Sequence, residues 1–160
     1  MKQISIDEVD RQLLQLLQRD SSLSNLQLAE RVHTSPPTCL RRVKRLHDMG
    51  LIERQVAILN PQRVALAVGH GLTAIVEITL DRQDAQALDA FEARMVPDDA
   101  VQQCYRVAPG PDFVLVVHVL HMQDYHALTR RLFTSDANVR NVKAFFSVHR
   151  SKFGAALPLG

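Results

Sequence analysis

The second half of the chain alternates between two hydrophobic periods, and this alternation limits the folds available to it. Period-two alternation, typical of half-buried strands, occurs in three stretches: 72–80, 101–107 and 142–148. Residues 113–119 are almost wholly apolar, as in a central strand. Apolar residues at helical spacing lie at 88–96 and 121–134. The resulting order, strand–helix–strand–strand–helix–strand, predicts a ferredoxin-like domain, a fold that by itself identifies no function.

Residues 5–50 are expected to fold as three helices. Apolar residues recur at three- and four-residue steps from Ile6 to Leu17, and a shorter apolar face follows at 28–32. Each predicted helix begins at a cap-like sequence: Ser5-x-x-Glu8 or Asp7-x-x-Asp10, then Ser24-x-x-Gln27, then Ser35 before Pro36. Gly50 is the expected end of the third helix. The protein is therefore expected to be of the α+β class.

A short second helix, a tight turn and a capped third helix describe a helix-turn-helix. On a helical projection of the third helix, one stripe holds Thr38, Arg41, Arg42 and Arg45. The opposite side holds Leu40, Val43 and His47, with Cys39 and Leu46 at its edge. This separation predicts a basic outer face and an apolar inner face.

The net charge is only +2, but the basic residues are unevenly spread. Five Lys or Arg and no Asp or Glu lie between Arg31 and His47, whereas the segment from residue 63 onward is balanced. One basic stripe on a neutral body indicates a local polyanion contact. A solvated helix face is the alternative, and the helix-turn-helix context favours double-stranded DNA.

In a helix-turn-helix the second helix enters the major groove, with its N-terminal residues toward the bases. The residues expected to approach bases are Ser35, Pro37, Thr38 and Arg41. Phosphate contacts, which carry no sequence choice, are expected from Arg42, Lys44 and Arg45, and at the preceding helix start from Ser24 and Asn25.

Several motifs occur together in a familiar order. They are Asp7-x-x-Asp10, Leu13-Leu14-x-x-Leu17-Gln18, Ser24-x-x-x-Leu28-Ala29, Ser35-Pro36, Leu40-Arg41-Arg42-Val43-x-x-Leu46, Gly50-Leu51-Ile52 and Leu59-Asn60-Pro61. The chain resembles, over nearly its whole length, the Lrp/AsnC transcription regulators of bacteria and archaea. It departs from them at Arg54-Gln55, where the family usually has Gly-Tyr.

The resemblance implies a winged-helix-like DNA-binding domain over 1–60 and a strand and hinge over 61–71. It also implies an effector-binding and oligomerisation domain, the RAM domain, over 72–160. From the residues, a short strand is expected at 54–59 and an apolar, partly ordered linker after Asn60-Pro61. The family forms dimers and higher homo-oligomers such as octamers, and it binds amino acids between subunits.

The effector site that the resemblance implies lies at the loop before the third strand, the start of the following helix and the end of the last strand. The matching positions are Pro109, Gly110, Asp112, Met122, Tyr125, Phe145, Phe146 and Ser147. Asp112 could accept from an amino-acid ammonium group, or it could simply stabilise its turn. Pro109 and Gly110 replace the family's Gly and acidic residue, and each proline removes a loop N–H donor.

Composition narrows the class of protein further. Hydrophobic residues make up 46% and charged residues 22%, the balance of a core-forming protein. The longest apolar runs are far shorter than the roughly 20 residues of a membrane span, and no secretory signal is present, so a cytoplasmic protein is expected. Two cysteines, Cys39 and Cys104, make no disulfide framework.

Catalytic and metal chemistry is not indicated. His118 and His121 lack the further ligands of a metal site, and Cys104 with His149 lacks a third catalytic group. We therefore expect no enzyme, no metal and no cofactor beyond a possible amino-acid effector. Two alternatives stay open beside an effector-responsive regulator: an architectural DNA-binding protein without an effector, and an enzyme or binding module with a merely structural helix-turn-helix.

Overall fold

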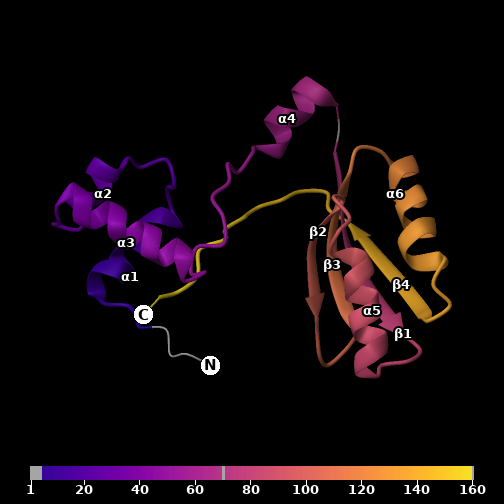
Figure 1. Ribbon diagram of the computed structural model, residues 1–160. Helices are drawn as coiled ribbons and strands as arrows, with labels where there is room; N and C mark the ends of the chain where they lie inside the picture. The colour runs from indigo at the N-terminus through magenta and orange to yellow at the C-terminus, as the bar shows by residue number, and fades with distance from the viewer. Residues whose placement is uncertain (1–4, 70, 160) are drawn as a thin grey trace. The chain divides into compact units, whose positions relative to one another are not determined.

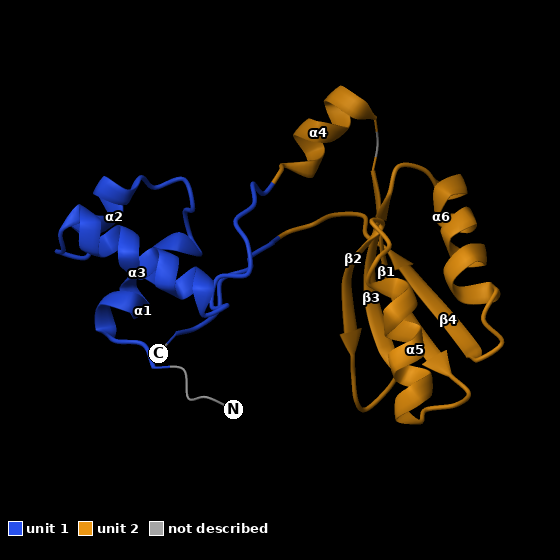
Figure 2. Ribbon diagram, in the orientation of Figure 1, with its two compact units in different colours: residues 1–58, 152–160 blue, residues 59–151 orange. Residues whose placement is uncertain are grey.

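A computed structural model of the chain describes residues 5–69 and 71–159 (Figure 1). The chain divides into two compact units (Figure 2). Residues 1–58 with 152–160 form the first, and residues 59–151 form the second. Each unit has a hydrophobic core of its own.

The first unit contains the three expected helices: α1 (Glu8–Leu17), α2 (Asn25–Arg31) and α3 (Pro36–Asp48). Capping boxes start α1 at Asp7 and α2 at Ser24, as predicted, since each cap side chain accepts from a backbone N–H one turn later. Ser35 precedes α3 but makes no side-chain cap bond. Its hydroxyl donates instead to Thr38 Oγ1 at 2.9 Å.

The core of this unit is formed by apolar residues of all three helices: Leu13, Leu14, Leu17, Leu28, Ala29, Val32, Cys39 and Leu46. The last residues of the chain return to it. Leu159 packs against the core, and the side chain of Gln18 exchanges two hydrogen bonds with the backbone of Leu157, at 2.8 and 2.9 Å. The first unit is therefore completed by residues far away in the sequence.

Two helices end in the same backbone motif with different residues at its key position. After α2, His33 adopts a φ of 53°, and the Thr34 N–H reaches the Ala29 carbonyl at 2.9 Å. After α3, Gly50 adopts a φ of 71°, and the Leu51 N–H reaches the Leu46 carbonyl at 3.0 Å. Both are Schellman motifs, which favour glycine because a positive φ strains other residues. The predicted stop at Gly50 is confirmed.

The segment between the predicted domains differs from expectation. Residues 54–59, where a strand is predicted, pair with no other segment of the described chain, so a strand formed by pairing with a partner subunit stays a prediction. The apolar stretch after it is a helix, α4 (Pro61–Val68). Asn60 caps it, accepting from the Arg63 N–H at 3.1 Å, and Pro61 occupies its first turn. None of its residues is buried within the described chain.

The second unit has the predicted ferredoxin-like topology. Its elements are β1 (Leu72–Leu80), α5 (Ala85–Met95), β2 (Val101–Arg106), β3 (Phe113–Val119), α6 (Met122–Thr129), the π-helical turn η1 (Arg130–Thr134) and β4 (Val139–Phe146). The strand order is β2-β3-β1-β4, and every neighbouring pair is antiparallel. The last strand therefore ends at Phe146, not at residue 148 as predicted. Beyond Ser147, whose N–H bonds to the Thr73 carbonyl, β1 offers no further backbone partner.

The two faces of the sheet differ in what covers them. Both α5 and α6 pack on one face, where alternate residues of β1 and β3 are fully buried with Phe91, Met95, Leu128 and Phe133 (Figure 1). The opposite face carries a row of apolar side chains: Ile75, Val114, Val116 and Phe145. Ile75 and Phe145 are 43% and 45% exposed. This face therefore leaves apolar side chains partly exposed.

The positive φ at Gly50 leads to a stability prediction. Gly50→Ala should lower the free energy of unfolding by about 1 kcal/mol, because a Cβ disfavours the left-handed region. Open space surrounds the added methyl group, so the backbone alone determines the cost. Gly154→Ala is the control, since Gly154 has the same open surroundings without a positive φ. Urea denaturation followed by circular dichroism measures both, and equal midpoints would contradict the assignment.

Candidate nucleic-acid interface and effector site

Helix α3 is rotated relative to the predicted projection. Its fully buried residues are Cys39 and Leu46, seven positions apart, with Val43 partly buried between them. Leu40 is 60% exposed and His47 is also exposed, so the prediction that both lie on the inner face is wrong. The spacing of Cys39 and Leu46 was the available signal, because residues seven apart share one helix face.

The outward face of α3 carries two cations without internal partners. Arg41 and Lys44 are exposed, and in the described part of the chain neither has an ion-pair partner. Pro37 and Leu40 lie on the same exposed side. Leu40 was missed as a candidate contact. An exposed leucine here offers the apolar group that a thymine methyl would meet in the major groove.

Two other arginines of α3 are engaged inside the unit. Arg42 Nη1 lies 2.7 Å from Asp7 Oδ2 and 2.9 Å from Asp10 Oδ1. Arg45 Nη2 donates to Asp10 Oδ2. Asp10 is 0% exposed, whereas the side chain of Arg45 remains 48% exposed. Arg42 was predicted to contact phosphate, but the structure places its guanidinium against α1.

The same carboxylates form the capping box of α1. The Asp10 N–H donates to Asp7 Oδ1 at 2.9 Å, and the Asp7 N–H donates to Asp10 Oδ2 at 3.2 Å. The backbone hydrogen bond from Asp10 and the guanidinium of Arg42 lower the pKa of Asp7, and the two carboxylates raise the pKa of Arg42. Because the folded pKa of Asp7 is depressed, its contribution to stability is present at neutral pH and is lost as the pH falls through that pKa.

The remaining predicted DNA contacts gather where α2 and α3 begin. The Asn25 side-chain amide donates to the Pro36 carbonyl at 2.8 Å and so ties the two helix starts together. Ser24 accepts from the Gln27 N–H at 3.2 Å. Ser35 and Thr38 are joined through their hydroxyls. These side chains hold the turn in shape and lie at the end of α3 that a helix-turn-helix presents to bases.

The predicted effector residues fall into two groups. At one end of the sheet, Asp112 Oδ2 accepts from the Leu80 N–H at 2.7 Å and from Gln83 Nε2 at 3.3 Å. The Asp112 N–H donates to the Ile78 carbonyl at 2.8 Å. Pro109 and Gly110 lie in the adjoining turn, where Gly110 has a φ of 126°. In the described chain the Asp112 side chain therefore ties its turn to the end of β1 and to Gln83.

The second group lies where β3 and β4 end. Met122 starts α6 and is exposed, and Tyr125, one turn later, is buried with its ring edge-on to Phe146 at a centroid distance of 5.0 Å. Phe145 lies on the opposite face of the sheet, under Lys143 Nζ at 4.7 Å from its ring centroid. Ser147 is exposed at the strand end. Tyr125 and Phe146 thus pack against each other.

The two groups are too far apart to surround one amino acid. Asp112 bonds to Leu80, and Ser147 bonds to Thr73. Leu80 and Thr73 are seven positions apart on β1. At about 3.3 Å per residue this separation is about 23 Å. One subunit therefore does not assemble the predicted effector site.

The described residues hold no metal site, no activated thiol and no membrane-spanning helix. Among them, no group of three or more His, Cys, Asp or Glu is placed to hold a metal ion. Burial raises the pKa of the Cys104 thiol, as it does that of Cys39, so neither is an activated nucleophile. No helix of the described chain is long and apolar enough to cross a membrane.

Comparison with known proteins agrees with this geometry. Residues 6–53 match the family model of a winged helix-turn-helix DNA-binding domain, and residues 73–157 match that of the Lrp/AsnC ligand-binding domain. An HTH-type transcriptional regulator of Haemophilus influenzae is 35% identical over 155 residues, covering 97% of this chain and 90% of the relative. The leucine-responsive regulatory protein of Salmonella typhimurium is 36% identical over 123 residues, covering 77% of this chain and 73% of the relative.

A solved structure is similar over nearly the whole chain. The crystal structure of a transcriptional regulator of Neisseria meningitidis in complex with L-Met has a TM-score of 0.82 at 29% identity, covering 97% of each chain. The two units thus define a DNA-binding transcription regulator with a ligand-binding domain. The chain belongs to the Lrp/AsnC family.

The buried carboxylate of α1 leads to a second stability prediction. Asp10→Asn should lower the free energy of unfolding by about 2–3 kcal/mol, because it removes the buried charge that two arginines share. Glu8→Gln is the control: Glu8 pairs with Arg11 on the surface, and losing such a pair costs well under about 1 kcal/mol. Urea denaturation midpoints measure the stability of both variants. Equal midpoints for Asp10→Asn and Glu8→Gln would show that the Asp10 pairs contribute nothing.

Proposed function

We propose that this chain is a sequence-specific regulator that binds operator DNA as a homodimer through the outward face of α3. The observation that carries the proposal is that only some of the basic residues of α3 form ion pairs within the unit. Arg41 and Lys44 are exposed and have no ion-pair partner among the described residues, whereas Arg42 and Arg45 bind Asp10. These two side chains are therefore available to a polyanion outside the unit. A polyanion that admits a helix, the DNA major groove, fits this description.

Base and phosphate contacts can be assigned on this face. Ser35, Pro37 and Thr38 begin α3, and Arg41 and Leu40 follow on its exposed side, so these residues would meet base edges. Lys44 and the exposed part of Arg45 would hold phosphates, with Ser24 and Asn25 at the neighbouring helix start. Because a helix-turn-helix dimer reads two half-sites about one helical turn or a multiple apart, an operator of that form is expected. DNA as the target places this activity in the cytoplasm.

Self-association is supported by the second unit. The sheet face opposite α5 and α6 leaves Ile75 and Phe145 partly exposed beside Val114 and Val116, the kind of patch that marks an interface. The separation of the two effector groups supports the same conclusion, since a partner subunit can bring them together. We assign DNA binding to residues 1–60, a hinge to 61–71, and effector binding with assembly into dimers and higher oligomers, such as an octamer, to 72–160, of which the residues from 152 onward belong to the first unit.

The proposed effector is an amino acid bound between subunits. Supporting this are the match to the family's ligand-binding domain and the similar Neisseria meningitidis regulator in complex with L-Met. Asp112 Oδ1 accepts no hydrogen bond in the described chain, so this oxygen could receive an ammonium group while Oδ2 keeps Leu80. Met122 and Phe145 would contact the side chain of the effector, beside Phe146 and Ser147.

The turn before β3 favours one competing function. Pro109 and Pro111 supply no N–H groups to hold an effector carboxylate. An architectural DNA-binding protein that responds to no small molecule would need none. Both functions are those of a non-enzymatic DNA-binding protein, as the relatives' transcription-regulator names suggest.

The salt dependence of DNA binding tests whether Lys44 contacts phosphate and Arg42 does not. For binding to a random-sequence duplex, the slope of log K against log salt should fall in magnitude by about 0.9 per lost phosphate contact. Lys44→Gln should show this decrease. Arg42→Gln should leave the slope unchanged, because its guanidinium is paired with Asp7 and Asp10. Fluorescence anisotropy at several salt concentrations measures both, and an equal decrease for Arg42→Gln would place that residue on DNA.

Calorimetry tests the effector. We expect one or more of the common amino acids to bind saturably to the full chain, and Asp112→Asn to weaken that binding at least tenfold. The asparagine keeps an oxygen for the Leu80 N–H but loses the charge that an ammonium group needs. Asp81→Asn, a nearby exposed acid, is the control. Unchanged affinity in Asp112→Asn would remove this residue from the site, and no saturable amino acid would favour the architectural function.

A further inference from the structure

Four exposed residues of α3 lie in one stripe along the helix. They are Pro37, Leu40, Arg41 and Lys44. The last three follow the first at three, four and seven positions, which is the spacing of residues on one helix face. The opposite side of the helix holds Cys39 and Leu46, which are fully buried. The stripe is therefore the part of α3 that faces away from the core of the first unit.

Leu40 is the large apolar residue of this stripe. Its side chain is 60% exposed, and it is not among the residues that pack against the core of the first unit. Pro37, one turn earlier, is also exposed, so the two apolar groups are neighbours on the helix surface. Arg41 and Lys44 have no ion-pair partner among the described residues. The stripe thus combines two apolar groups with two cations.

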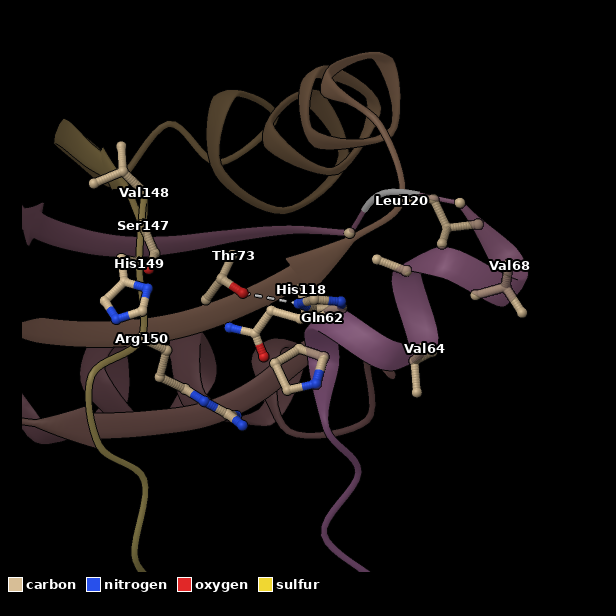
Figure 3. Close-up of a pocket in the computed structure, with 14 residues that line it drawn as sticks. Gln62, Val64, Val68, Thr73, His118, Leu120, Ser147, Val148, His149 and Arg150 are labelled. Atoms are coloured by element: carbon tan, nitrogen blue, oxygen red, sulfur yellow. Dashed lines mark hydrogen bonds between the residues drawn. The ribbon is translucent and has the colours of Figure 1, made fainter.

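Exposed apolar side chains of the second unit have a different setting. Val68, Leu120 and Val148 line one cavity beside α4 (Figure 3), and Ile75 and Phe145 lie in the apolar row on the open face of the sheet. These side chains have apolar neighbours within their own unit. Leu40 differs, because the rest of its stripe is one proline and two cations. A ligand that matches the α3 stripe has to offer negative charge and an apolar group side by side.

The major groove of DNA offers this combination. Phosphates lie along its edges, and thymine carries a C5-methyl group, the apolar group that base pairs present in this groove. The edges of the other three bases present hydrogen-bonding groups there. A helix-turn-helix directs the N-terminal part of its second helix toward the bases. Pro37 and Leu40 belong to that part, since they are the second and fifth of the 13 residues of α3.

We propose that Leu40, together with Pro37, packs against the C5-methyl group of a thymine in each half-site of the operator. This inference rests on the proposed DNA binding through α3, and it names the base that the apolar part of the stripe recognises. Leu40 is then a specificity-determining residue that makes no hydrogen bond. It distinguishes thymine from cytosine, because C5 of cytosine carries only a hydrogen atom.

Uracil in place of thymine removes this methyl group and keeps the base pair. An operator is first selected from random duplexes with the full chain, and each of its thymines is then replaced singly by deoxyuridine. We expect one position in each half-site where the replacement weakens binding about fourfold, the factor that corresponds to losing the burial of one methyl-sized group. Fluorescence anisotropy measures these affinities. An operator in which no thymine shows this loss would overturn the proposal.

Three variants locate the effect. Leu40→Ala should bind the thymine and uracil operators equally, because too little side chain remains to contact the methyl group. Leu40→Met keeps an apolar side chain of similar volume and should keep the preference for thymine. Leu26→Ala is the matched control, since this leucine of α2 is 57% exposed and lies outside the stripe. A thymine preference that persists unchanged in Leu40→Ala would overturn the proposal.

Two checks separate the contact from indirect effects. Any change in duplex flexibility caused by uracil is the same for all variants, so the difference between the wild-type chain and Leu40→Ala isolates the contact. Truncation of an exposed side chain should also leave the urea midpoint nearly unchanged, which shows that Leu40→Ala is folded.

Cytosine methylation gives a second readout that a merely structural role of Leu40 would not change. With cytosine at the identified position, adding a C5-methyl group should strengthen binding by the wild-type chain about fourfold, because it restores the same apolar contact. Leu40→Ala should show no difference between cytosine and 5-methylcytosine. Equal binding of the two bases by the wild-type chain would contradict the proposal.

The outcome is separable from that of the proposed function. A selection that yields no preferred sequence would overturn sequence-specific binding, and this proposal with it. A preferred operator without a methyl effect would overturn this proposal alone. A changed molecular mass of Leu40→Ala in light scattering, together with an unchanged thymine preference, would place Leu40 in a protein interface instead.

Discussion

The buried Asp10 carboxylate determines how the DNA-binding helix is held. A carboxylate removed from water is strongly unfavourable unless it is paired and hydrogen-bonded, and here both of its oxygens accept from arginines of α3. The same side chain closes the capping box of α1, so the start of one helix is fixed to the middle of another. This arrangement orients α3 so that Arg41 and Lys44 face outward. An apolar residue at position 10 could fill the space, but it would not fix the rotation of a helix about its own axis.

In the second unit, the geometry keeps the two groups of the proposed effector site apart. The strands of one subunit keep Asp112 and Ser147 at opposite ends of β1, and no local movement of a loop closes a gap of about 23 Å. A site that uses both groups exists only when another subunit approaches. Its occupancy would then be coupled to the state of assembly, because a ligand that contacts two subunits favours the arrangement that presents both.

Much of the fold could be predicted because the signals are local. The caps at Asp7 and Ser24, the end at Gly50 and the alternation along β1 each depend on residues within one turn or one strand. The predictions that differ from the structure concern residues whose partners are remote in the sequence. A projection of α3 alone cannot show that Arg42 turns inward, because its partners lie on α1, more than 30 residues away. Residues 54–59 form no strand within the single chain, since a strand needs a neighbour that the local pattern does not identify.

The candidate sites were predictable to different degrees. Of the residues predicted to approach bases, Arg41 is exposed and Thr38 is half-buried in the structure, while Leu40, predicted to lie inside, is exposed beside them. The effector residues were identified by position along the chain; since Asp112 precedes β3 and Met122 follows it, the predicted topology already placed these two residues at opposite ends of that strand.

The path of the chain between the two units has a consequence for how such proteins can recombine. The chain leaves the first unit near residue 58 and returns to it near residue 152, where Leu157 bonds with Gln18 and Leu159 joins the core. The ligand-binding unit is therefore an insertion within the DNA-binding unit. A single genetic crossover between two relatives would give one unit a tail evolved for another core. Exchange of ligand specificity between regulators of this construction needs two crossovers, one on each side of the insertion.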